Sequence, residues 1–131
     1  MKTKSEHINF WIEQAIDDWE VVEMLFSGKK YVQALFYSHF VIEKFCKAIW
    51  IKHNESNVPP RLHNLIYLMK QTPVEIPDSR MELMLNLNRF QLEGRYPEYV
   101  SSLYKICEME FTNHIITDVK ELKEWLHKQL Q

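Results

Sequence analysis

Residues 92–100 read LEGRYPEYV and break a region that otherwise has a helical pattern. The glycine of this stretch, one of only two in the chain, is expected to end a helix. Pro97 disfavours helical backbone at the residue before it, so Arg95 and Tyr96 are presented on a stiff turn. A planar guanidinium held in this way suits bidentate contact with a phosphate or a carboxylate. The alternative is structural: Arg95 pairs with a buried glutamate such as Glu43, and Tyr96 closes the end of the helical packing.

A second group of polar side chains lies on residues 30–53, a segment that is otherwise apolar. At about 100° per residue they fall in one sector of a helix, together with two phenylalanines. The members are Gln33, Phe36, His39, Phe40, Glu43, Lys44 and Lys47. A solvated face usually lacks two phenylalanines, so this polar–aromatic strip indicates a groove wall or a partner surface. The simpler interpretation is an ordinary ion pair between Glu43 and Lys47, worth roughly a few tenths of a kcal/mol.

A histidine follows the double proline in the stretch RLHNL, near the start of a short expected helix. A histidine in this position commonly caps the helix or packs against a neighbour. The other interpretation is that His63, with Arg61 and Asn64 beside it, reaches an anion. Both interpretations stay open at this point.

The sequence contains none of the compact motifs that announce a reaction. It has no GxxxxGK[ST] phosphate loop, no CxxC or HExxH zinc signature and no serine in an elbow motif. We therefore predict no catalytic residue, no metal site and no cofactor.

Composition limits the kinds of partner. A chain of 131 residues with 46% hydrophobic and 13% aromatic residues can bury the core of one ordinary domain. Its net charge of −2 argues against binding duplex nucleic acid by charge, so RNA is a less favoured partner. The chain has two cysteines, which suit a reducing compartment, and its start has no signal-peptide core. It also lacks the roughly 20-residue apolar run of a membrane span. We therefore predict a cytoplasmic protein with no membrane partner.

Apolar residues at three- and four-residue steps predict helices along nearly the whole chain. The expected helices cover residues 4–27, 30–53, 61–71, 78–94 and a last stretch after Thr112, with residues 101–110 forming a loop or a short turn. Helices joined by short connections around one core predict an all-α fold. We expect a single antiparallel up-and-down bundle of about five helices, forming one domain over residues 1–131.

Three helix ends have recognisable signals. Thr3 with Glu6 predicts a capping box at the start of the first helix. Gly28 is expected to end that helix in the left-handed conformation. Asp78 or Ser79 is expected to cap the fourth helix, with Glu82 completing a box with Ser79.

Four stretches of the chain, in this order, resemble the HEPN family, the small helical domains named for higher eukaryotes and prokaryotes nucleotide-binding. The stretches are AIDDWEVVEMLFSGKKYVQALFYS, SHFVIEKFCKAIW, LHNLIYL and LNRFQLEGRYP. The resemblance implies an up-and-down bundle that forms a symmetric homodimer. It also implies that the family's shared surface, taken here as a ligand-binding site, contains Glu43, Lys47, His63, Arg95 and Tyr96.

The resemblance implies one of two roles. Many family members are partners of a minimal nucleotidyltransferase encoded beside them. Others are metal-independent ribonucleases, often toxins, marked by an arginine with a histidine four to six residues later. No arginine of this chain has a histidine at that spacing. We therefore expect a non-catalytic partner of a minimal nucleotidyltransferase that binds a nucleotide or another phosphate ligand.

Two alternatives stay open. One is a toxin-type ribonuclease with an atypical pair, in which His63 shuttles a proton and Arg95 stabilises the phosphorane. The other is a structural assembly module in which Phe36 and Phe40 form a dimer interface and no ligand binds.

Overall fold

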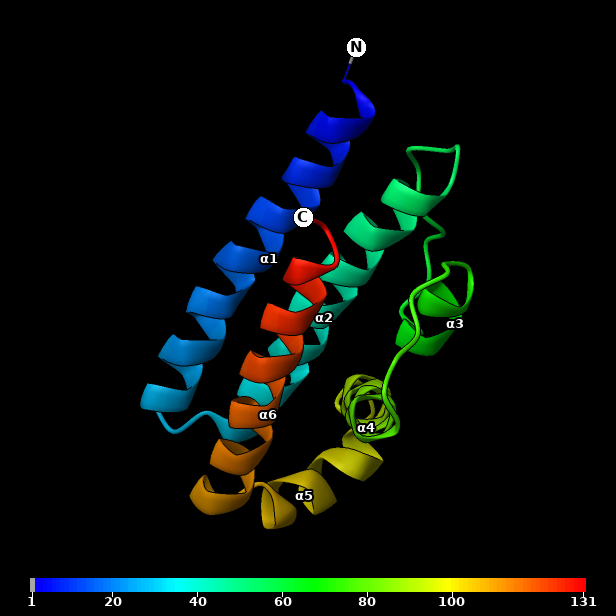
Figure 1. Cartoon of the computed structure of the whole chain (residues 1–131). Coiled ribbons are helices and arrows are strands. Elements are labelled where there is room, and N and C mark those ends of the chain that lie inside the picture. Colours follow the sequence, from blue (N-terminus) through cyan, green and yellow to red (C-terminus); the bar gives the residue numbers. More distant parts are fainter. Residues whose placement is uncertain (1) are drawn as a thin grey trace.

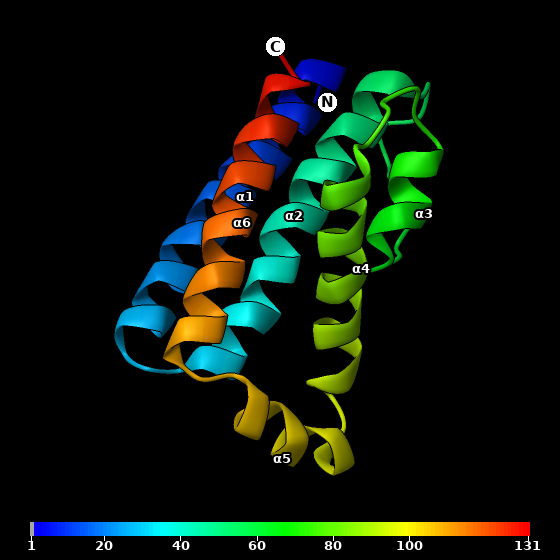
Figure 2. The same cartoon turned by 60° about the horizontal axis from the view of Figure 1, so that its bottom comes forward.

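The computed structural model describes residues 2–131, and all regular secondary structure in that part of the chain is helical (Figure 1). The helices are α1 Lys4–Ser27, α2 Tyr31–His53, α3 Leu65–Lys70, α4 Asp78–Glu93, α5 Pro97–Ile106 and α6 Met109–Lys128. Helices α1, α2 and α6 lie side by side, whereas α4 is seen end-on in Figure 1 and crosses them at a steep angle. The short α3 and α5 lie in the connections on either side of α4 (Figure 2). The predicted all-α helical fold is confirmed, with six helices in residues 2–131 where about five were expected.

Helix α2 is the middle of the bundle, and it contacts each of the other helices. Figure 2 shows α1 and α6 on one side of it and α3 and α4 on the other. A helix surrounded in this way needs apolar residues on nearly every face, as the sequence of α2 has. Three polar members of the predicted strip, His39, Glu43 and Lys47, are buried with this helix. Much of the strip is therefore internal and does not form an open groove wall.

Lys29, the residue after Gly28, makes the turn between α1 and α2. The capping box of Thr3 and Glu6 is confirmed, with the Glu6 amide donating to Thr3 Oγ1 at 3.2 Å. Gly28 has a φ of −83°, whereas Lys29 has the positive φ of 62°. The predicted left-handed conformation of Gly28 is thus wrong. Lys29 makes the turn, and the amide of Lys30 then donates to a carbonyl oxygen in the last turn of α1 at 2.8 Å.

The starts of α3 and α4 also differ from the predicted ones. Helix α3 begins at Leu65 and not near residue 61, because the side-chain oxygen of Asn64 accepts hydrogen bonds from two amides of its first turn. Helix α4 begins at Asp78 with Pro77 as its N-cap and without a side-chain cap hydrogen bond. The predicted cap by Asp78 or Ser79, and the box built on Ser79, are therefore wrong.

The chain forms a helix, α5, directly at the Arg-Tyr-Pro corner. The loop or short turn predicted over residues 101–110 overlaps this helix. Pro97 begins α5, where a helix has no use for the amide that proline lacks. Leu103 and Cys107 are buried and attach this segment to the core. Helix α6 begins at Met109 and not after Thr112, whose side chain is buried in the first turn.

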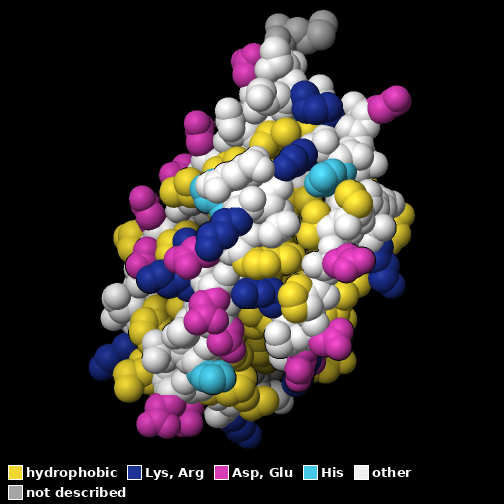
Figure 3. Space-filling model, viewed as in Figure 1, with side chains coloured by type: hydrophobic (Ala, Val, Ile, Leu, Met, Phe, Trp, Pro, Cys, Tyr) yellow, Lys and Arg dark blue, Asp and Glu magenta, His cyan; other side chains and the backbone are white. Residues whose placement is uncertain are grey.

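The surface carries both signs of charge. Figure 3 shows acidic and basic side chains interspersed over one face, with hydrophobic side chains visible between them. Across residues 2–131, none of the helices has the length and apolar character that a membrane span requires.

Gly94 ends α4 in a crowded position, which gives the first prediction. A Cβ atom at Gly94 would lie 2.9 Å from the Phe90 carbonyl oxygen and 3.0 Å from Cδ2 of Phe36. We expect Gly94→Ala to lower the free energy of unfolding by about 1–3 kcal/mol, the usual cost of overpacking, as measured by urea denaturation.

Gly28→Ala is the matched control for this measurement. The nearest atom to a Cβ at Gly28 lies at 3.4 Å, and the φ of −83° suits alanine. Its stability should stay unchanged or rise by about 0.4–1 kcal/mol. Equal losses in the two variants would show that crowding at Gly94 has no special cost.

Candidate functional site

Glu43 is the centre of a buried polar cluster on the middle helix. Lys47, one turn further along α2, donates from Nζ to Oε2 of Glu43 at 3.0 Å. The other carboxylate oxygen, Oε1, lies 2.8 Å from Nδ1 of His63. Glu43 is only 4% exposed and Lys47 is also buried, so the two charges neutralise each other away from water.

His63 reaches this carboxylate from the segment between α2 and α3. Pro59 and Pro60 exclude a continuation of helix in this segment. The side chain of His63 is 47% exposed, so its ring connects the buried carboxylate to the surface. A carboxylate bonded to Nδ1 fixes the orientation of the ring and leaves Nε2 for a ligand or a proton.

His39 is a further member of the cluster, and it is fully buried. Its Nε2 lies 2.7 Å from the carbonyl oxygen of His63 and 3.3 Å from Oδ1 of Asn88. Both neighbours are acceptors, so we assign the proton to Nε2. Burial lowers the pKa of His39 and outweighs the Glu43 carboxylate, which raises it. The ring is therefore neutral, and the 3.7 Å approach of its Nδ1 to Glu43 is not an ion pair.

Asn88 extends this cluster, which we call the Glu43 cluster, to helix α4. Its Oδ1 also accepts from the amide of Leu65 at 3.1 Å, and its Nδ2 donates to Oδ1 of Asn64 at 3.2 Å. The Glu43 cluster consequently links α2, α4 and the start of α3. The roles of His39 and Asn88 had no clear signal in the sequence, because each depends on which backbone carbonyl or amide comes near in the fold.

Arg95 is exposed and lies apart from this cluster. With the amide of Gln91 oriented so that its oxygen faces the guanidinium, Gln91 accepts from Nε of Arg95 at 3.0 Å and also from Nη2. The suggested Arg95–Glu43 pair does not form, because Glu43 is bonded to Lys47 and His63. The corner packs on α2 at Phe36, which lies seven residues, or about 10 Å, from Glu43 along the helix.

Tyr96 is exposed at the same corner and packs edge-to-face on Tyr99, with ring centroids 6.3 Å apart. The two rings line a hollow of about 420 Å³ together with Leu92, Glu93 and Glu98. This hollow is aromatic and acidic. The structure therefore divides the predicted site residues into two groups, with Glu43, Lys47 and His63 together and the pair Arg95 and Tyr96 elsewhere.

The remaining polar members of the strip bond to neighbouring helices. Lys44 pairs with Asp18 of α1, and Gln33 donates to the hydroxyl of Tyr104 on α5 at 2.8 Å. Phe36 and Phe40 are half-buried and pack edge-to-face, with centroids 5.1 Å apart. Most of the strip thus serves contacts within the chain.

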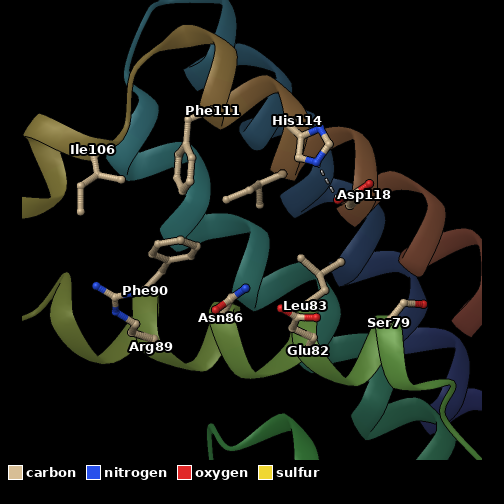
Figure 4. Close-up of a pocket in the computed structure, with 11 residues that line it drawn as sticks. Ser79, Glu82, Leu83, Asn86, Arg89, Phe90, Ile106, Phe111, His114 and Asp118 are labelled. Atoms are coloured by element: carbon tan, nitrogen blue, oxygen red, sulfur yellow. Dashed lines mark ion pairs between the residues drawn. The ribbon is translucent and has the colours of Figure 1, made fainter.

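A larger cavity of about 510 Å³ lies between α4 and α6, away from the predicted site residues (Figure 4). Phe90 and Phe111 line it and pack edge-to-face, with centroids 6.4 Å apart. Its lining contains the carboxylates of Glu82 and Asp118 and one arginine, Arg89, which is bonded to Glu93. This cavity therefore has an apolar floor and an excess of negative charge.

Comparison with protein-family models decides the family. The model of the HEPN domain matches residues 8–130. This chain belongs to the HEPN domain family. The matched range contains all of the predicted site residues, and HEPN membership suggests a role connected with nucleotides or RNA. Comparisons with curated proteins and with solved structures gave no significant match.

The Glu43 cluster makes a strong prediction for the stability of this HEPN domain. Glu43→Gln would leave the Lys47 ammonium buried without its counter-charge, so we expect a loss of about 3–5 kcal/mol in the free energy of unfolding. Urea denaturation measures this loss. The control is Glu93→Gln, which breaks the surface pair with Arg89 and should cost at most about 1 kcal/mol. A cost for Glu43→Gln as small as the control's would contradict the buried pair.

The neutral His39 makes the HEPN domain sensitive to acid. Its folded pKa is lowered from 6.5, so the unfolded chain binds the proton more readily. Its contribution to stability is therefore complete above pH 6.5 and falls as the pH drops from 6.5 through the lowered folded pKa. We expect the free energy of unfolding at pH 7.5 to exceed that at pH 5.5, and His39→Gln to reduce this difference. An unchanged pH dependence in His39→Gln would refute the assignment.

Proposed function

We propose that this HEPN domain is a non-catalytic, homodimeric partner of a minimal nucleotidyltransferase and that it also binds a nucleotide or another phosphate ligand. The observation that carries the non-catalytic part is the separation of His63 from Arg95. These two residues are the pair that a ribonuclease of this sequence would use. His63 is bonded to Glu43 in the Glu43 cluster. Arg95 is bonded to Gln91 at the corner before α5, where Tyr96 also lies.

Cleavage of a phosphodiester by an acid–base pair requires both groups at one phosphate. A proton-transferring histidine must lie within hydrogen-bond reach of the attacking or leaving oxygen. The cation that stabilises the phosphorane must contact the same phosphorus group. His63 contacts α2 at Glu43, whereas the corner that carries Arg95 contacts it at Phe36, about 10 Å away along the helix. This difference in position, together with the existing bonds of both side chains, favours a binding role over catalysis.

The corner around α5 has the composition of a protein-binding surface. Its exposed large hydrophobic side chains are Leu92, Tyr96, Tyr99, Tyr104, Ile106 and Met109. A group of this size is unusual on a surface that has no partner. Tyrosine and arginine are enriched at the centres of interfaces, and here Arg95 stands beside Tyr96. We therefore propose that the nucleotidyltransferase contacts the α5 corner.

This proposal predicts that a minimal nucleotidyltransferase is encoded beside this chain, and that protein is used for the test. The two proteins should elute as one complex in size-exclusion chromatography after co-expression. The double variant Arg95→Ala, Tyr96→Ala should weaken the complex by roughly 30-fold or more, as expected for loss of an interface hot spot of about 2 kcal/mol. Separate elution of the unmodified proteins would refute the proposal.

The control for this double variant lies on α3. Tyr67 is exposed to nearly the same extent as Tyr96, at 46% and 45%, and Lys70 is an exposed cation beside it. The double variant Tyr67→Ala, Lys70→Ala should leave the affinity unchanged. An equal loss in both double variants would place the interface elsewhere.

A further inference from the structure

A third concave surface is lined by residues from the first turns of α1, from α2 and from the loop that follows α2. The start of α1 and this loop lie at the same end of the bundle (Figure 1). This pocket has a volume of about 340 Å³. Its basic and aromatic lining residues are Lys2, His7, Phe10, Trp11, Lys47 and Arg61. The remaining wall comes from residues 57–59. We call it the basic pocket.

Every ionisable side chain that lines the basic pocket is basic. Lys2 and Arg61 contribute two positive charges, whereas the charge of Lys47 is neutralised by its bond to Glu43. No carboxylate lies in the lining. The chain as a whole has a net charge of −2, so this local excess opposes the overall balance. The nearby carboxylate is Glu43, which is already bonded to Lys47 and His63. The pocket therefore favours an anion with more than one negative charge.

Two aromatic rings line the same pocket and lie next to its cations. Nζ of Lys2 is 4.4 Å from the centre of the Phe10 ring, and Nζ of Lys47 is 5.2 Å from that of Trp11. The rings of Phe10 and Trp11 meet edge-to-face, with centroids 6.0 Å apart. Phe10 is exposed, so part of its ring is open to a ligand. Such a lining suits a ligand that joins an anionic group to a flat ring.

The other concave surfaces have different chemistry. The hollow at the α5 corner is lined by Glu93 and Glu98, which repel an anion. The cavity between α4 and α6 is lined by two carboxylates, Glu82 and Asp118, and by Arg89, which is bonded to Glu93, so it too disfavours an anion. Among these surfaces, the basic pocket has the clear excess of positive charge.

We infer that the basic pocket binds the phosphates of a single nucleoside di- or triphosphate through Lys2 and Arg61, with the base against Phe10. Ligand pockets span about 300–1,000 Å³, and a volume near the lower limit favours one nucleotide over a dinucleotide. The inference deepens the proposed function, and it rests on that function in the choice of a nucleotide as the phosphate compound. The inferred ligand site differs from the predicted one. It lies away from Arg95, and its lining includes Lys2, Phe10, Trp11 and Arg61.

The test is calorimetric titration of the isolated full chain with ATP, adenosine and tripolyphosphate. ATP should bind, and adenosine and tripolyphosphate should bind more weakly, because each offers only half of the contacts. Arg61→Gln should weaken ATP binding about tenfold, the usual value of one charge-assisted hydrogen bond. Arg89→Gln, an exposed arginine on α4, is the matched control and should leave the affinity unchanged.

A further variant separates the base from the phosphates. Phe10→Leu keeps an apolar side chain and should lower ATP affinity about five- to tenfold while leaving tripolyphosphate unaffected, because loss of stacking costs roughly 1–1.4 kcal/mol. Equal affinities of the unmodified chain for ATP and tripolyphosphate would overturn the nucleotide assignment.

Three other results would overturn the inference. They are no heat with ATP, full affinity in Arg61→Gln alongside a loss in Arg95→Gln, and binding that is restricted to RNA oligonucleotides. All these measurements use the isolated chain. They are therefore independent of whether a nucleotidyltransferase complex forms. Nucleotide binding in the basic pocket and complex formation at the α5 corner can each fail without the other.

Discussion

The buried carboxylate of Glu43 is the constraint on which the arrangement of this bundle depends. A charge inside a helical core is costly unless a counter-charge and hydrogen bonds accompany it. Lys47 supplies the charge from the same helix, and His63 supplies a hydrogen bond from a segment 20 residues away in the chain. The chain must therefore return to the middle of α2 after the double proline. The same return delivers the His63 carbonyl oxygen to His39.

The two ends of α2 present different chemistry to possible partners. Beyond Lys47, the first turns of α1 and the loop after α2 form a surface rich in cations and aromatic rings. Near Phe36, the corner before α5 exposes tyrosines beside Glu93 and Glu98. A small anion and a protein surface can therefore contact the same chain without competing for the same residues. This division agrees with the proposed binding of a protein partner and of a phosphate compound at separate places.

The sequence predicted the bounds of the helices whose apolar residues repeat periodically. It did not predict the side-chain partners that are set by tertiary contacts. Helices α1 and α2 have nearly the predicted bounds, because their apolar residues repeat over more than twenty positions. Spacing alone predicted the pair of Glu43 and Lys47, whereas His63 joined them only through the family resemblance. The partner of Arg95 was not predictable, because Gln91 lies one turn earlier on an unremarkable helix and is selected by its burial. Nor did Lys2 and Trp11 stand out, because they meet Arg61 only in the folded chain.

The shortness of α3 has a consequence for motion. A helix of six residues cannot persist by itself in water, so α3 is ordered by what holds it from outside. The contacts at its start run through His63, Asn64 and Asn88 to the middle of the bundle. Opening of the stretch between α2 and α4 must therefore break both this polar attachment and the burial of Leu65, Leu68 and Met69, while the four long helices stay packed.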